Sequence, residues 1–144
     1  MSLKVQIKES KQVSKWVEYK DAEGNVLAEF KIRGEGYQAY IAAKEQAHNQ
    51  VSAKGFDVEK ATKDDKTYIE LLRDCVACHL IEDWKGIEFE DEKGNVTQPP
   101  YTQENAIKLL RMGDIGNILW LFITTHAIEI QAQADKEHKE TLGK

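Results

Sequence analysis

The segment from Asp83 to Leu110, DWKGIEFEDEKGNVTQPPYTQENAIKLL, indicates the order of elements in this chain. It starts a strand at Trp84 with Trp-Lys-Gly-Ile and passes through an acidic Gly-Asn turn. It then reaches Pro99-Pro100-Tyr101, just before a helix cap at Thr102. It offers no nucleophile, metal cage or phosphate cradle. The pattern predicts a strand pair followed by a helix, in a small module that presents surface to another protein.

The motif D-x-x-G-N-V occurs twice, at residues 21–26 and 91–96, each time after residues that alternate between apolar and polar. Gly and Asn tolerate the positive φ angles that a tight hairpin needs. We therefore predict one firm β-hairpin at 15–33. A second, short hairpin is predicted at 85–98, where Pro99-Pro100 ends the return strand. Two ordinary hairpin turns explain the repeated motif better than a repeat architecture does.

Apolar residues elsewhere recur at helical spacing. This periodicity predicts about four helices, at residues 36–51, 67–84, 103–112 and 115–130. The fold class is therefore α+β and mostly helical, and 144 residues are most simply one domain, 1–144. Residues 52–66 are polar and predict a mobile loop, and residues 131–144 predict a polar C-terminal tail.

The last predicted helix is apolar on nearly every side. Such a helix must be buried in its own domain or in a partner. This helix is therefore the predicted protein-interaction element. Its candidate contact residues are Ile118, Trp120, Leu121, Phe122, Ile123 and Ile130.

The charge and apolar content exclude several classes of partner. All of the net charge of −5 falls in residues 73–144, which carry 8 basic and 13 acidic side chains. No basic stripe is available for a phosphate backbone, so we expect no nucleic acid partner. The longest apolar run, Ile118 to Ile123, is far short of the ~20 residues that span a bilayer, so we expect no membrane partner. With no secretory signal and only two cysteines, the chain is predicted to be cytoplasmic.

Cys75-Val-Ala-Cys78-His79 has the form of a c-type haem attachment motif. The alternative is therefore a small haem- or metal-binding redox protein. Haem attachment accompanies export, whereas this motif falls within an amphipathic helix that packing already explains. A zinc site would need a fourth ligand, for which a second copy or Glu82 is the nearest source. We expect these cysteines to be structural, with no cofactor and no metal.

No other pattern predicts catalysis. The four histidines are scattered over different predicted helices, without a neighbouring nucleophile in a recognised motif. The acidic run at 88–92 lacks EF-hand spacing, and Gly34-Glu-Gly36 lacks the rest of a phosphate loop. We therefore expect a protein that is not an enzyme.

The segments Asp83–Ile87, Gly94-Asn95 and Pro100–Ala106 together resemble the tail assembly chaperone family of long-tailed, siphovirus-type bacteriophages. In that family a tryptophan-glycine strand leads to a helix start of the form Pro-Tyr/Phe-Ser/Thr-x-Glu, and a helix-rich C-terminal half follows. The resemblance covers about Leu71 to Ala127. Its structural motif residues are Trp84, Gly86, Ile87, Tyr101 and Thr102.

The resemblance implies a chaperone that holds the helical tape measure protein soluble while tail tube subunits polymerise around it. It implies self-association, contact with the tape measure protein, the tail tube protein as a further candidate partner, and location in the cytoplasm of the bacterial host. Such a chaperone is absent from the mature virion. A general phage tail adaptor or virion component remains an alternative.

Overall fold

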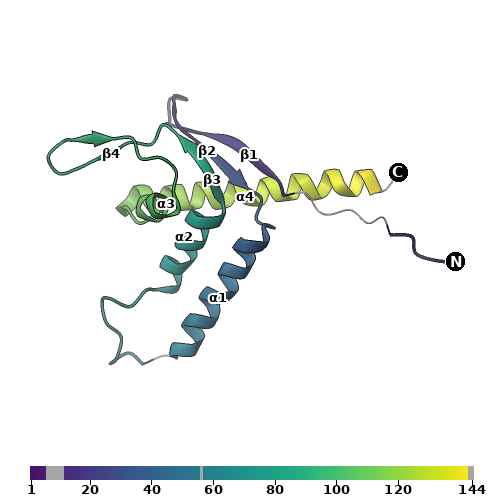
Figure 1. Ribbon diagram of the computed structural model, residues 1–144, viewed down its shortest axis with the longest axis horizontal. Coiled ribbons are helices and arrows are strands. Elements are labelled where there is room, and N and C mark those ends of the chain that lie inside the picture. The colour runs from purple at the N-terminus through teal and green to yellow at the C-terminus, as the bar shows by residue number, and fades with distance from the viewer. Residues whose placement is uncertain (6–11, 56, 143–144) are drawn as a thin grey trace.

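The computed structural model describes residues 1–5, 12–55 and 57–142. Within these residues it contains four helices and two antiparallel sheets, which confirms the predicted α+β class (Figure 1). The strands are β1 (Ser14–Lys20), β2 (Val26–Arg33), β3 (Ile81–Lys85), β4 (Phe89–Glu90) and β5 (Val96–Thr97). The helices are α1 (Gln38–Lys54), α2 (Tyr68–His79), α3 (Gln103–Leu110) and α4 (Gly113–Leu142).

Both predicted hairpins are present, β1–β2 and β4–β5. Their turns share one set of hydrogen bonds. The Asp21 Oδ1 accepts from the backbone N–H groups of Glu23 and Asn25, each at 2.9 Å, and Asp91 repeats this with Lys93 and Asn95. These hydrogen bonds lower the pKa of both carboxyl groups. The bonds from Asn25 to Asp21 and from Asn95 to Asp91 have the largest effect. The repeated motif therefore stabilises the turn of each hairpin.

The three-stranded sheet has the order β1-β2-β3. Phe30 on the central strand lies between Val17 of β1 and Trp84 of β3 and has no exposed surface. Its neighbours Ala28 and Ile32 are buried on the same side. The opposite side is charged, with Lys31 3.5 Å from Glu82. One sheet face therefore forms the core and the other meets solvent.

The helix predicted at 67–84 is shorter than expected, and this prediction was wrong at its C-terminal end. Helix α2 ends at His79, and Ile81–Lys85 forms strand β3 beside β2. Arg33 explains where the helix stops: its backbone N–H donates to the Leu80 carbonyl at 2.8 Å, and its guanidinium donates to the His79 carbonyl at 3.1 Å. The strand therefore satisfies carbonyl groups that the helix end leaves unpaired.

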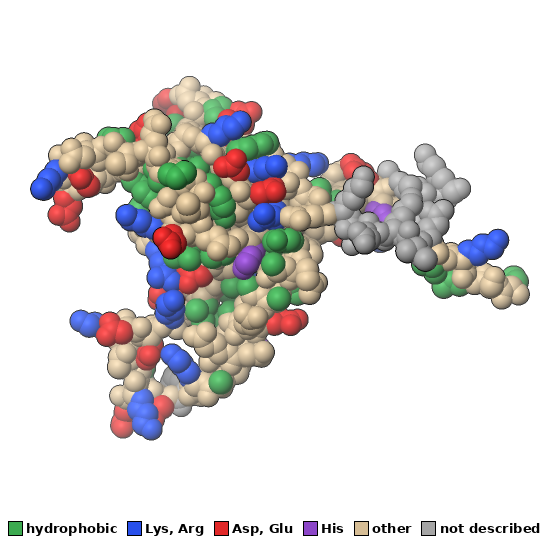
Figure 2. Space-filling model, viewed as in Figure 1, with side chains coloured by type: hydrophobic (Ala, Val, Ile, Leu, Met, Phe, Trp, Pro, Cys, Tyr) green, Lys and Arg blue, Asp and Glu red, His purple; other side chains and the backbone are tan. Residues whose placement is uncertain are grey.

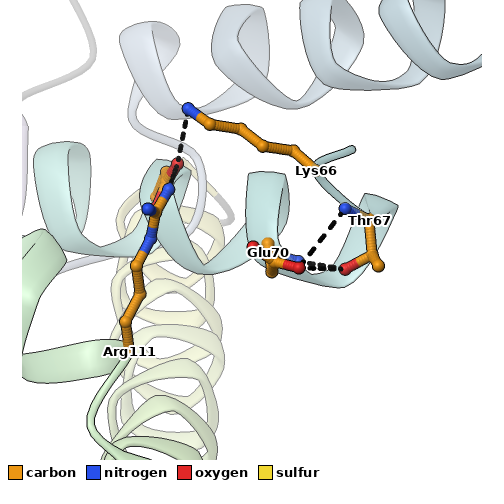
Figure 3. Close-up of polar contacts among 5 residues, drawn as sticks. Lys66, Thr67, Glu70 and Arg111 are labelled. Carbon is orange, nitrogen blue, oxygen red and sulfur yellow. Dashed lines mark hydrogen bonds and ion pairs between the residues drawn. The ribbon is translucent and has the colours of Figure 1, made fainter. Parts of the chain in front are cut away.

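The N-terminus of α2 is a capping box, drawn in Figure 3. The Thr67 hydroxyl accepts from the Glu70 N–H at 3.2 Å, and the Glu70 carboxylate accepts from the Thr67 N–H. Farther along α2, Asp74 accepts two hydrogen bonds from Arg111, at 2.6 and 3.1 Å, and lies 4.0 Å from Lys66. The Asp74–Arg111 pair ties α2 to the residue that ends α3.

The segment from β3 to α3 is held by Trp84. Its indole N–H donates to the Pro99 carbonyl at 3.0 Å, and its ring meets Tyr101 edge-on at 5.3 Å. The Tyr101 hydroxyl donates to the Ala77 carbonyl of α2 at 3.0 Å, and burial raises its pKa to about 12. The Thr102 hydroxyl caps α3 by accepting from the Asn105 N–H at 3.0 Å, as predicted.

The predicted loop and tail have different boundaries in the structure. Helix α1 continues to Lys54, so residues 52–54 are helical, and the ion pair between Lys54 and Asp65 joins the two ends of the connection to α2. Phe56 lies outside the described residues. The predicted polar tail continues α4 from residue 131 to 142, and residues 143–144 lie outside the described part.

Helix α4 packs beneath the inner face of the sheet, and its C-terminal part extends beyond the sheet (Figure 1). Its start is set by Gly116, which lies against the end of α3. A Cβ atom at this position would lie 2.6 Å from the Leu110 carbonyl oxygen. The close approach of α3 and α4 therefore requires a residue without a side chain.

We expect Trp84→Ala to lower the free energy of unfolding by about 3–5 kcal/mol, because the ring is buried and its hydrogen bond is lost. Trp16→Ala is the matched control, since Trp16 lies on the exposed sheet face and should cost about 1 kcal/mol or less. Thermal unfolding of both variants tests this. An unchanged melting temperature for Trp84→Ala would show that the ring does not support the core.

We expect Gly116→Ala to destabilise the protein by about 1–3 kcal/mol, because the methyl group would force two backbones apart. Ile115→Ala, at the adjacent exposed position, should stay within about 1 kcal/mol of the parent. Denaturant unfolding of the two variants measures the difference. Equal stabilities would mean that the corner between α3 and α4 accommodates a side chain.

Candidate protein-binding surface

Helix α4 carries apolar residues on two opposite sides. The inner side packs on the sheet, and its buried residues are Leu119, Ile123, Ala127 and Ile130. Ile123 and Ile130 were predicted as interaction residues. That part of the prediction needs correction, because Ile123 has no exposed surface and Ile130 is 5% exposed. Both belong to the core and are closed to a partner in this structure.

The outer side of α4 faces away from the core. Ile118 is 49% exposed and Leu121 is 53% exposed, and both were among the predicted contact residues. Ile115 and Ile128 are exposed to a similar degree. We call Ile115, Ile118, Leu121 and Ile128 the outer face of α4. Four large aliphatic side chains along one helix face form an apolar surface of the kind that marks protein-binding sites.

A depression of about 350 Å³ lies beside this outer face. Its lining residues are Tyr19, Ile118, Leu121, Phe122, Thr125 and His126. Phe122 forms the inner wall, with its ring 5.1 Å from Tyr19 and 4.5 Å from His126. Tyr19 was not predicted as part of the site. The sequence feature that could have identified Tyr19 is its position two residues from Val17, on the apolar side of β1. This position places the Tyr19 side chain on the side of the strand that faces α4.

Trp120, the remaining predicted contact residue, is only partly exposed. The Arg73 guanidinium lies 5.2 Å from the centre of the Trp120 ring, and Arg73 also donates to the Asn117 side chain at 2.9 Å. These contacts attach α4 to α2. Trp120 therefore supports the helix from its side and contributes less surface than Leu121.

Figure 2 shows one face of the molecule, with its side chains coloured by type. Basic and acidic side chains lie beside one another over the helical hairpin of α1 and α2 and around the β4–β5 turn. Interspersed charges of both signs keep a surface well solvated. No helix in the described part of the chain is long and apolar enough to cross a membrane.

The structural motif residues have scaffold roles. Gly86 has a φ of +80°, and a Cβ there would lie 3.1 Å from the Leu27 carbonyl oxygen, so the chain can leave β3 beside β2 only at a glycine. Ile87 packs against the core together with Tyr101. With Trp84 and the Thr102 cap described above, these residues position α3 and the corner that leads to α4.

Gly34-Glu-Gly36 also has a structural role. The backbone N–H of Gly36 donates to the side-chain oxygen of Gln131 at 3.0 Å, and a Cβ on either glycine would collide with that side chain. This contact fastens the start of α1 to α4.

The cysteine motif lies on α2 and at its end. Cys75 is buried and Cys78 is partly buried, and burial raises the pKa of both thiols. Burial, together with Arg33, lowers the pKa of His79. The neutral thiols are poor nucleophiles and metal ligands, which both need the thiolate. Among the described residues, no three His, Cys, Asp or Glu side chains are grouped to hold a metal ion.

We expect the double variant Cys75→Ala, Cys78→Ser to fold and to retain most of its stability, because the thiols serve as small packing groups. The parent protein should show no Soret band and no stoichiometric zinc. Absorption spectra, metal analysis and thermal unfolding of parent and variant test this. A haem chromophore or bound zinc in the parent would support the redox alternative.

Comparison with known proteins gives a family for the chain. Residues 35–144 match the family described as YdaY prophage protein, so the match includes all four helices, the β3 strand and the second hairpin. No curated protein and no solved structure matches the chain. Because the match covers well over half of the sequence, the chain belongs to the YdaY prophage protein family.

Proposed function

We propose that this prophage protein is a non-enzymatic tail assembly chaperone that binds the tape measure protein and promotes assembly of the tail tube. The observation that carries the proposal is the outer face of α4. Ile118 and Leu121 are about half exposed on a helix whose other side is already buried in the core. Such a face is suited to the apolar side of a long helical partner.

Two further observations support this role. Membership of a prophage family places the chain among phage-derived proteins. The stretch that resembles tail assembly chaperones forms the scaffold around Trp84 and Tyr101, which leads directly to the helix that carries the outer face. The net charge of −5 would help to keep a complex with an apolar partner soluble.

The proposal also places the protein in the cytoplasm of the bacterial host, outside the mature virion. A chaperone has to release its partner, so its contact surface should be modest. One helix face with an adjoining depression fits that requirement better than an extensive permanent interface. The tail tube protein is a possible further partner during release.

Co-expression with the tape measure protein of the same prophage tests the function. The parent chain should increase the soluble fraction of the tape measure protein and co-purify with it. Leu121→Glu should abolish both effects while the chain remains folded, because the side chain is exposed in the single chain and the charge opposes apolar contact. Ile69→Glu on α2 is the matched control, since Ile69 is equally exposed but lies away from this face.

A tape measure protein that is equally insoluble with and without the chain would contradict the chaperone function. Equal activity of Leu121→Glu and the parent would reject the outer face as the contact. Mass spectrometry of purified virions adds a separate readout. The chain in stoichiometric amounts there would indicate a virion component or tail adaptor.

A further inference from the structure

One line of side chains along α4 continues beyond its aliphatic residues. Steps of three and four residues keep positions on the same side of a helix. Starting from the helix N-terminus, the positions on this side are Asp114, Ile118, Leu121, Thr125, Ile128, Ala132 and Lys136. All seven side chains are exposed. The line has the spacing of a seam between two helices.

This seam is nearly symmetric about Thr125. Ile118 and Ala132 each lie seven positions from Thr125, and Asp114 and Lys136 each lie eleven positions from it. If a second α4 is laid against the first in the opposite direction, centred on Thr125, Ile118 of one copy meets Ala132 of the other, and Leu121 lies at the level of Ile128 and Glu129. Asp114 of one copy then faces Lys136 of the other at both ends of the contact.

The side chains along the seam favour close approach of the two helices. Thr125 and Ala132 are small, whereas Ile118, Leu121 and Ile128 are large. In the antiparallel arrangement, Ile128 of the second copy lies opposite Leu121 and Phe122. These two residues line the depression of about 350 Å³, which an isoleucine side chain could enter. The seam therefore pairs a projecting side chain with a hollow on the other copy.

The C-terminal part of α4 provides an independent argument. Among the α4 side chains whose burial is described, up to residue 139, Ile130 is the last buried one, and those from 132 to 139 are mostly exposed. Gln131 at the start of this segment accepts from the Gly36 N–H at 3.0 Å, and two pairs lie within the helix: Gln131 with Asp135 at 2.9 Å, and Gln133 with Glu137 at 3.0 Å. In proteins most helical stability comes from tertiary packing of one helix face, which this segment largely lacks within the described residues. Antiparallel pairing would lay this segment along the start of the partner's α4.

We propose that a second copy of this chain covers Ile118, Leu121 and Ile128 of the outer face of α4, in a twofold antiparallel contact centred on Thr125. The seam supplies apolar contact, complementary end charges and support for the projecting helix. These observations support the dimer without reference to the proposed function. One consequence rests on the proposed function: the tape measure protein must displace the second copy, so dimerisation and partner binding compete for one surface.

Cysteine cross-linking of the purified chain tests the geometry. In the Cys75→Ala, Cys78→Ser background, Thr125→Cys should give a disulfide-linked dimer on mild oxidation, because residue 125 faces its own copy at the twofold axis. Leu121→Cys should not link to itself, since the two copies of residue 121 would be about 12 Å apart along the helix axis. A mixture of Leu121→Cys and Ile128→Cys chains should give the mixed dimer.

Sedimentation of the parent chain, which has its native cysteines, provides the second measurement. The parent should sediment as a dimer, and Asp114→Lys should raise the dimer dissociation constant about three- to tenfold at low salt. Lys136→Asp should do the same, and the double variant should restore the parent value. Ile69→Glu should leave the dimer unchanged.

Three results would overturn the proposal. The first is a parent chain that remains a monomer at high concentration. The second is a Leu121→Cys chain that links to itself as efficiently as Thr125→Cys, which would indicate a parallel contact. The third is a charge-reversed double variant that does not recover the parent dissociation constant. None of these measurements contains the tape measure protein, so their failure is distinct from failure of the proposed chaperone function.

Discussion

The antiparallel pairing of β2 with β3 is the interaction on which the rest of the structure depends. It joins segments about fifty residues apart, and it places Trp84 opposite Phe30 in the core. The same pairing ends α2, because Arg33 binds the carbonyl groups at its last turn. Since Trp84 then fixes Pro99 and Tyr101, the positions of α3 and of the corner before α4 follow from this one strand pair.

Local signals were sufficient for much of the fold. Alternating residues around Gly24-Asn25 predicted the first hairpin, and the Thr102 cap predicted the start of α3. The first part of strand β3 was assigned to the preceding helix, because its apolar residues continue the helical spacing of α2. Only β2, distant in sequence, makes an extended conformation favourable there. Such pairing depends on tertiary contacts that periodicity cannot report.

The candidate surface was predictable only in part. An excess of apolar residues identified α4, but composition could not show which side of the helix the sheet would cover. Ile123 and Leu121 have similar chemistry and lie two positions apart, yet one is fully buried and the other is half exposed. Tyr19 reaches the depression from β1 because the hairpin packs on α4, and this too is a tertiary contact.

The attachment of α1 has a consequence for how the molecule opens. This helix packs mainly on α2 and buries only Tyr40 and Ala47 among its described residues, whereas the sheet and α4 share the continuous core. Stability is distributed unevenly in such a structure, and segments with few buried contacts separate at a lower free energy than the whole domain. Backbone amides of α1 should therefore exchange with deuterium through local opening, while those of β2 and the middle of α4 exchange only on global unfolding.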